Sequence, residues 1–133
     1  MTVQERPGRA ATAAMKVRAD PAEDLALSRL ERQGLLLIAR NYACRGGEID
    51  LIMRDGATLV FVEVRHRARP EFGTPEETIG IGKQRRLVLA AQHYLVRNPD
   101  WAGRPMRFDV VAFSGPLDRA EFRWIRNAIM SSG

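Results

Sequence analysis

The sequence has 133 residues, 45% of them hydrophobic and 28% charged, which is the size and balance of one folded globular domain. It contains no apolar run near the ~20 residues that span a bilayer and no secretory signal, and its single cysteine, Cys44, excludes an intramolecular disulfide framework. We therefore expect a cytoplasmic protein with no membrane partner. The net charge of +5 and the pI of about 10.3 favour polyanionic partners, nucleic acid above all.

The first predicted elements are an irregular arm and a helix. Residues 1–20 are rich in Ala, Arg and Thr without periodicity, which predicts a flexible arm. Asp20 and Pro21 are typical of a helix start, with Asp20 as the N-cap. Apolar residues then recur at helical spacing as far as Gly34, so we expect a helix over residues 21–33.

Three strands are expected next, arranged as an antiparallel meander. Residues 35–40 form a short apolar run, residues 48–54 alternate in polarity, and residues 58–67 are rich in Val and Phe. The Asp55-Gly56 pair between the second and third strands is a strong hairpin signal.

The second half of the chain predicts a loop, a helix and two strands. Residues 68–82 are rich in Gly and Pro and indicate a loop, with one helical turn where residues 74–77 match a capping box. Residues 83–97 carry apolar side chains at helical spacing. Residues 106–113 predict a central strand that pairs in parallel, because a helix precedes it, and residues 121–125 suit an extra edge strand. The fold class is therefore α/β, in the order α-β-β-β-α-β.

Carboxylates interrupt two of the predicted strands. Glu63 follows apolar residues on one face of the third strand, and Asp50 stands inside an apolar segment of the second. A turn at residues 55–56 would set Ile52 opposite Leu59. That register would bring Glu48 and Asp50 towards Glu63.

Clustered carboxylates stay ionised only when positive charge lies among them. Mg²⁺ or Mn²⁺ suits this role, because hard divalent ions take oxygen ligands, keep several waters, and polarise phosphate oxygens. Arg65 would then lie beside the attacking water or the scissile phosphate. The alternative is a structural cluster of ion pairs, for example from Glu63 to Arg65 or Arg67, and spacing alone leaves both interpretations open.

Several segments form a recognisable combination: residues 47–52, 60–67, 72–73, 107–111 and 125–128, with Glu23, Ala26, Gly34, Asn41 and Lys83. Together, over roughly residues 21–130, they resemble the YraN family of small bacterial proteins. That family is in turn similar to the PD-(D/E)xK nucleases, near the archaeal Holliday junction resolvases. The resemblance implies a single nuclease-like domain over residues 21–130, with a restriction-endonuclease-like mixed sheet flanked by helices.

The resemblance also implies the site. Asp50 and Glu63 would bind Mg²⁺ (or Mn²⁺), with Glu23 contributed from the first helix. Asp50, Glu63 and Arg65 would be catalytic. Lys83 opens the second predicted helix on its apolar side, where it either reaches into the cleft to touch phosphate or is a solvated lysine. The symmetry of junctions further implies a homodimer, as in resolvases.

One position departs from the superfamily pattern, which has a lysine two residues after the glutamate where this chain has Arg65. Arginine binds phosphate and stabilises negative charge but does not act as a general base. Three functions therefore stay open: a metal-dependent nuclease acting on DNA, branched DNA included; a nuclease-like module that binds nucleic acid without cutting it, through Arg65, Arg67 and Lys83; and a scaffold for a protein partner. Asp109, inside an apolar strand, suits either a structural anchor paired with Arg107 or a support for the site.

Overall fold

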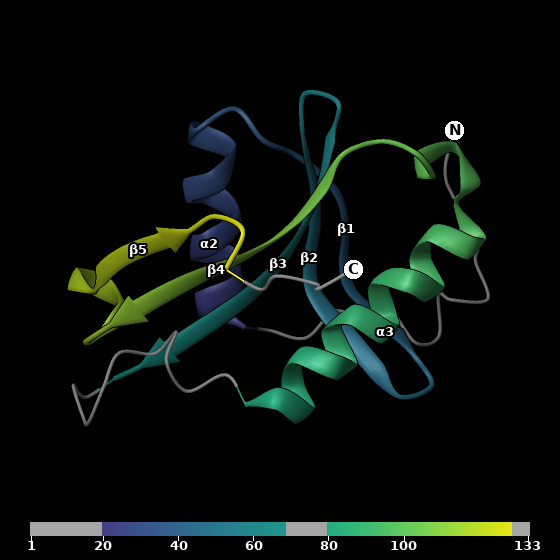
Figure 1. Cartoon of the computed structure of the whole chain (residues 1–133). Helices are drawn as coiled ribbons and strands as arrows, with labels where there is room; N and C mark the ends of the chain where they lie inside the picture. The colour runs from purple at the N-terminus through teal and green to yellow at the C-terminus, as the bar shows by residue number, and fades with distance from the viewer. Residues whose placement is uncertain (1–19, 69–79, 129–133) are drawn as a thin grey trace.

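The computed structural model of the protein describes residues 20–68 and 80–128 (Figure 1). Its elements are α2 (Pro21–Arg32), β1 (Leu36–Cys44), β2 (Gly47–Asp55), β3 (Thr58–Arg67), α3 (Ile81–Arg97), β4 (Met106–Ser114) and β5 (Glu121–Ile125), with short 3-10 helices at Pro99–Trp101 and Leu117–Arg119. The predicted order of elements is confirmed, including the extra edge strand. The expected arm before Asp20 and the capping box at residues 74–77 lie outside the described residues.

The strands form one five-stranded mixed sheet in the order β1-β2-β3-β4-β5. The pairs β1–β2, β2–β3 and β4–β5 are antiparallel, and β3–β4 is parallel. Parallel pairing follows from the connection, since the chain passes through α3 between β3 and β4 and so returns to the same end of the sheet. The prediction of an interior parallel strand over residues 106–113 is thereby confirmed.

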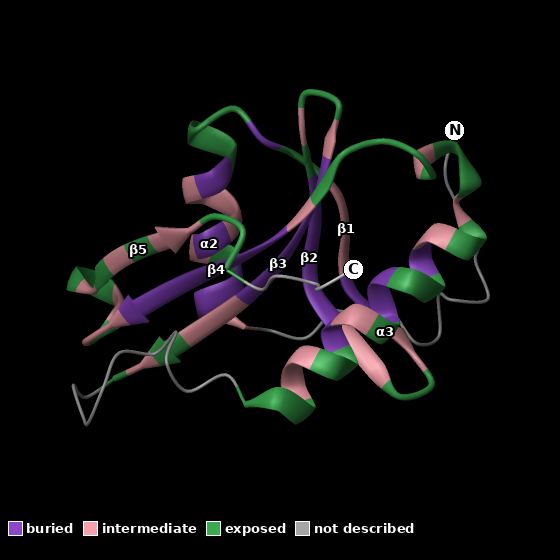
Figure 2. Ribbon diagram, viewed as in Figure 1, coloured by how far each residue is buried: buried purple, intermediate pink, exposed green. Residues whose placement is uncertain are grey.

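The two long helices cover opposite faces of the sheet, and each closes one hydrophobic layer (Figures 1 and 2). The layer under α3 contains Tyr42, Ile49, Ile52, Leu59, Phe61, Leu87, Ala90, Ala91, Tyr94 and Phe108. The layer under α2 contains Ala22, Ala26, Leu30, Leu35, Leu51, Met53, Val60, Val62, Val111 and Phe113. With helices on both faces, β2, β3 and β4 are buried on both sides, which explains why their sequences are nearly continuous apolar runs.

Helix α2 begins as the sequence predicts. One carboxylate oxygen of Asp20 accepts hydrogen bonds from the backbone N–H groups of Ala22 at 3.0 Å and Glu23 at 3.2 Å. Gly34 follows the helix with φ of 98°. Glycine adopts this left-handed conformation without the steric strain that a Cβ atom would bring, and the helix ends there.

Two predicted boundaries are wrong. The first strand continues to Cys44 rather than ending at Arg40, because it passes an irregularity between Leu37 and Ala39 and then resumes pairing with β2. Helix α3 begins at Ile81, inside the stretch predicted as loop, since a glycine in the first turn of a helix weakens the sequence signal without preventing the helix.

The predicted hairpin register is also wrong, by two residues. Ile52 pairs with Phe61, whereas Leu59 pairs with Arg54. The reason is the turn: Gly56 takes its first central position, with φ of 61°, so that Asp55 closes the hairpin against Thr58. The observed register has a direct consequence for the acidic residues described below.

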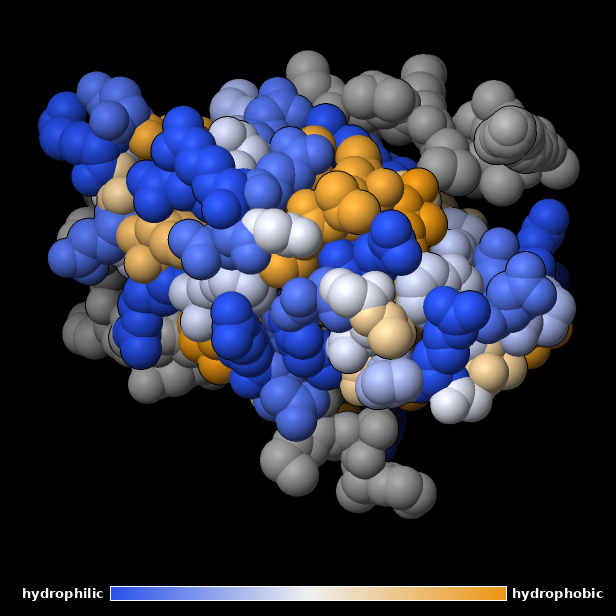
Figure 3. Space-filling model, turned by 90° about the horizontal axis from the view of Figure 1, so that it is seen from above, coloured by the Kyte–Doolittle hydropathy of each residue, from blue (hydrophilic) through white to orange (hydrophobic). Residues whose placement is uncertain are grey.

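Apolar side chains gather at the end of the sheet where β1 and β4 begin. Leu36, Leu37 and Met106 are 53%, 38% and 38% exposed there, and Figure 3, seen from above, shows an apolar area bordered by hydrophilic side chains. Within residues 20–68 and 80–128, no helix has the length and apolar character needed to cross a bilayer. The charged residues of interest lie towards the other end of β3.

Candidate metal and phosphate site

The site is built where the ladder between β2 and β3 stops. Leu51 and Val62 are the last paired residues, and the same register places Asp50 opposite Glu63. Beyond that point the backbone N–H of Val64 donates to Asp50 Oδ2 at 2.8 Å, so a side chain takes the role of a strand partner. The corrected register thus brings the two predicted acids together more closely than the expected one did.

Glu63 is buried with an incomplete set of partners. Its residue is only 4% exposed. Oε2 lies 3.6 Å from Arg65 Nη1 and 3.6 Å from Lys83 Nζ. Oε1 is fully buried and has no hydrogen-bond partner among the described residues. A buried carboxylate oxygen without a donor or cation is costly, so this oxygen is poised to accept one.

Asp50 is held close to its titration midpoint at neutral pH. Burial, reinforced by the negative charge of Glu63, raises the pKa of Asp50 to about 7, while the Val64 N–H acts in the opposite direction. A bound cation would favour the ionised carboxylate. Proton release and cation binding are therefore coupled at this residue.

Glu23 approaches the same place from helix α2. It is 3% exposed, and its Oε1 accepts a hydrogen bond from Asn41 Nδ2 at 2.9 Å. Burial raises the pKa of Glu23, and the negative charge of Asp50 raises it further. In the part of the chain that the structure describes, however, no group of three or more His, Cys, Asp or Glu side chains is placed to hold a metal ion. The structure thus brings Glu23 beside Asp50, with Asn41 as its hydrogen-bond donor.

Asn41, which the sequence analysis used only for the family resemblance, lies in the site beside Glu23. Its backbone is left-handed, with φ of 52°, and the residue is only 5% exposed. Its Oδ1 is buried without a hydrogen-bond partner among the described residues. Apart from that resemblance, the signal in the sequence was an amide side chain directly after the predicted strand at residues 35–40.

Basic residues flank the acidic pair. Lys83 reaches Glu63 from α3, with its Nζ 3.6 Å from Oε2. Val64, Arg65, His66 and Arg67 line an open pocket of about 390 Å³ at the end of β3. His66 lies on the face of β3 opposite to Glu63, and its Nε2 is 2.9 Å from the carbonyl oxygen of Gly115. The arrangement suits an anionic group, with the cations on one side of the acids.

These observations define the class of protein: a mixed α/β domain with a buried acidic pair beside basic side chains. The chain belongs to the family described as "Uncharacterised protein family UPF0102", which it matches over residues 22–113. This confirms the YraN-like family that the sequence resembles. The match runs from α2 to β4 and so includes Glu23, Asp50, Glu63 and Lys83.

Similar proteins come from several bacteria, and each is described as a UPF0102 protein. The one from Stutzerimonas stutzeri (strain A1501) is 48% identical over 110 residues, covering 83% of this chain and 92% of that protein. The one from Janthinobacterium sp. (strain Marseille) is 52% identical over 107 residues, covering 80% and 82%. The one from Dechloromonas aromatica (strain RCB) is 52% identical over 107 residues, covering 80% and 83%.

Proposed function

We propose that this protein is a metal-dependent phosphodiesterase of the PD-(D/E)xK type that binds DNA, branched DNA included, and hydrolyses its backbone. The observation that carries the proposal is the state of Glu63: one carboxylate oxygen is buried without a partner, beside Asp50, while two cations lie 3.6 Å from the other. The resemblance to PD-(D/E)xK nucleases supports the same assignment.

The residues present fit Mg²⁺ or Mn²⁺. Both ions prefer carboxylate oxygens, and Mg²⁺ is commonly bound through one or two carboxylates with water and substrate phosphate filling the other positions. Asp50 and Glu63 supply two such buried carboxylates. A divalent ion bound there supplies polarisation of a phosphate oxygen and a more acidic water.

The side chains around the pair have separate tasks. The Val64 N–H orients Asp50, and Asn41 orients Glu23 next to it. Arg65 and Lys83 bind the scissile phosphate and offset negative charge that develops on it. Arg65 takes no part in proton transfer, because a guanidinium keeps its proton in proteins. Any proton acceptor must therefore be another group.

A second candidate is a nuclease-like module that binds nucleic acid without cutting it. It is favoured by Arg65 at the position where the superfamily has lysine, since this change removes a proton acceptor and keeps a phosphate ligand. The basic side chains of Arg65, Arg67 and Lys83 would then be the functional ones.

Cleavage assays separate the two candidates. Branched, flapped and single-stranded DNA would be incubated with wild type, Asp50→Asn and the control Asp118→Asn in Mg²⁺, Mn²⁺ or EDTA. Asp118 is a suitable control because its side chain is 76% exposed and lies outside the site. The proposal expects metal-dependent products from wild type and the control but not from Asp50→Asn. Salt-sensitive binding without products would support the binding module, and neither binding nor products would overturn both.

A further inference from the structure

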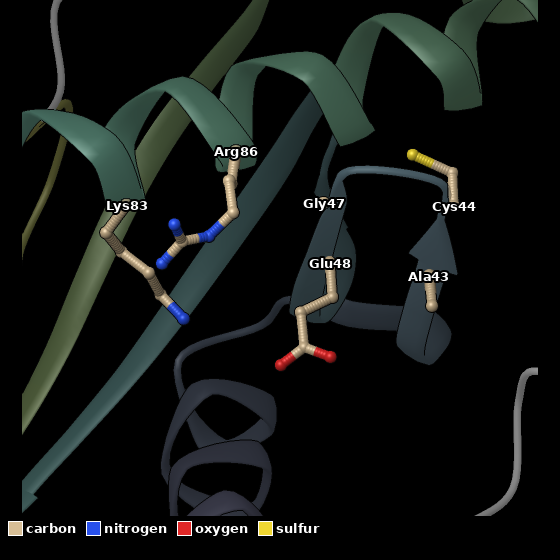
Figure 4. Close-up of a pocket in the computed structure, with 6 residues that line it drawn as sticks. All are labelled: Ala43, Cys44, Gly47, Glu48, Lys83 and Arg86. Atoms are coloured by element: carbon tan, nitrogen blue, oxygen red, sulfur yellow. The ribbon is translucent and has the colours of Figure 1, made fainter.

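A second pocket, of about 330 Å³, lies between the β1–β2 hairpin and the first half of α3 (Figure 4). It is lined by Ala43, Cys44, Gly47, Glu48, Lys83 and Arg86. Lys83 is the residue that this pocket shares with the site around Glu63.

The walls of the pocket are held in place by direct backbone packing. A Cβ atom at Gly47 would overlap the carbonyl oxygen of Arg86, and one at Gly46 would lie 2.9 Å from a methyl carbon of Leu89. The hairpin can approach α3 this closely only with glycine at position 47, because the overlap there is with backbone, whereas the Leu89 side chain could move away from a Cβ at position 46. The distance between hairpin and helix is thus fixed before any ligand binds, which reduces the ordering that binding requires.

The charge of the pocket suits an anion. Lys83 and Arg86 lie three residues apart on α3, and in Figure 4 both side chains leave the helix on the side of the hairpin, with the Arg86 guanidinium turned towards Lys83. Two cations against one carboxylate leave the lining positive. The helix adds to this, because α3 contains four Lys and Arg residues and no Asp or Glu between Ile81 and Arg97. A guanidinium and an ammonium together are typical ligands of phosphate.

The pocket adjoins the acidic pair through one shared residue. Lys83 lines the pocket, and its Nζ is also 3.6 Å from Glu63 Oε2. A nucleic-acid strand with one phosphate at Asp50 and Glu63 would therefore bring a neighbouring phosphate to Arg86. We propose that this pocket binds the backbone phosphate next to the scissile one, with Arg86 as its principal ligand and Lys83 between the two phosphates. The inference rests on the proposed function, since it takes the acidic pair as the site of cleavage.

Binding without metal tests the pocket separately from catalysis. The probe is a fluorescently labelled twelve-nucleotide oligothymidylate, followed by anisotropy in EDTA over a salt series. The variants are Arg86→Ala and Arg85→Ala, which are adjacent, exposed and lose the same charge, but only Arg86 lines the pocket. We expect Arg86→Ala to weaken binding about five- to tenfold and to reduce the salt slope by about 0.7, the contribution of one phosphate contact on a single strand. Equal effects of the two variants, or no effect of either, would overturn the proposal.

Nuclear magnetic resonance localises the contact. Thymidine 3′,5′-bisphosphate and inorganic phosphate would be titrated separately into the ¹⁵N-labelled protein in EDTA. We expect the bisphosphate to shift the backbone amide signals of Gly47 and Glu48 in wild type and Arg85→Ala but not in Arg86→Ala. If inorganic phosphate shifts them equally strongly, the pocket takes a free phosphate rather than a strand, and the proposal fails. The proposal also fails if the bisphosphate leaves the Gly47 and Glu48 signals of wild type unshifted.

The two proposals fail in different ways. If wild type cleaves DNA with Mg²⁺ while Arg86→Ala binds like Arg85→Ala, the pocket assignment falls and the phosphodiesterase stands. If the Arg86-specific loss is found but no substrate is cleaved, the phosphodiesterase falls, and the pocket is a phosphate subsite of a binding module without a scissile position.

Discussion

Two buried carboxylates lie on adjacent strands of the sheet, Asp109 on β4 and Glu63 on β3. Both oxygens of Asp109 are satisfied: each is 3.1 Å from Arg107 Nε, Oδ2 accepts from Trp124 Nε1 at 2.9 Å, and Oδ1 from the Asn127 N–H at 2.9 Å. Glu63 has two ion pairs at 3.6 Å to one oxygen and no hydrogen-bond partner for the other among the described residues. Two buried carboxylates therefore differ in their hydrogen bonding: both oxygens of Asp109 have partners, whereas Oε1 of Glu63 has none among the described residues.

The difference distinguishes Asp109, a structural acid, from Glu63, the acid that we propose binds a metal ion. Asp109 ties β4 to Trp124 in β5 and to the backbone that follows it, so its contacts stabilise the fold. The sequence left two interpretations of Asp109 open, a structural anchor or a support of the site. This geometry favours the anchor, with Arg107 as the expected partner. Glu63 makes fewer contacts of this kind, and its buried Oε1, which has no hydrogen-bond partner among the described residues, is the atom that we propose binds the metal ion.

The largest expected effect is that of Asp109→Ala. The change leaves the Trp124 and Asn127 N–H groups without their acceptor and removes one of the two carboxylate partners of Arg107, which keeps Asp55. We therefore expect a cost of about 3 kcal/mol, at the lower end of the range for breaking a buried charge pair from one side. The measurement is the free energy of unfolding in urea. Asp118→Ala serves as the exposed control and should stay within about 0.5 kcal/mol of wild type. A loss of stability at Asp109 no larger than at Asp118 would show that Asp109 does not stabilise the fold.

The next effect is at Asn41, where backbone and side chain can be separated. Asn41→Ala removes the donor to Glu23 and places an alanine at φ of 52°, so we expect a loss of about 2–3 kcal/mol. Asn41→Gly removes the same donor but tolerates the backbone, and it should be about 1 kcal/mol less destabilised than the alanine variant. Urea unfolding of both variants measures this. An Asn41→Gly variant that is the less stable of the two would show that the left-handed conformation is not a source of strain.

An effect of a different kind is expected in the pH dependence of stability. Because the pKa of Asp50 is raised from 3.8 to about 7 on folding, its contribution is fully present below the unfolded value and is lost as pH rises through about 7. The free energy of unfolding of wild type should therefore fall between these pH values. Asp50→Asn should reduce this slope. Part of the pH dependence should remain, because the pKa of Glu23 is raised as well. Identical slopes in wild type and Asp50→Asn would contradict the account of Asp50.

The smallest effect on stability is expected for Glu63→Gln, in contrast to Asp109. Replacing an incompletely paired buried carboxylate by a neutral amide of similar shape removes a desolvation cost as well as two long ion pairs. We expect a change within about 1 kcal/mol of wild type in either direction, by the same urea measurement. A loss as large as that of Asp109→Ala would show that Glu63 is structural.

The sequence predicted the elements and the two central acids because both depend on local patterns. Period-two alternation exposed Asp50 and Glu63 as charges within apolar strands, and the capping residue Asp20 marked the start of α2. Their exact pairing was not predictable, because the register depends on whether Asp55 or Gly56 begins the central part of the turn. One residue in that choice moves every partner across the hairpin by two.

The remaining parts of the site arise from contacts between distant segments. Asn41 meets Glu23 only because β1 is irregular before Ala39 and α2 packs across it. Arg86 and Gly47 form one pocket only because the hairpin rests on α3. Neither contact leaves a periodic pattern in the sequence, since each depends on packing between elements and not on spacing within one.

The most direct test of the central claim is calorimetric titration of Mg²⁺ and Mn²⁺ into wild type, Glu63→Gln and Glu121→Gln, with folding checked by circular dichroism. Glu121 is the matched control, because it is an exposed glutamate on β5 outside the site. The account predicts binding to wild type and Glu121→Gln, stronger as pH rises towards about 7 while Asp50 loses its proton, and no binding to Glu63→Gln. Equal binding to wild type and Glu63→Gln, or no binding to wild type with or without DNA, would contradict it.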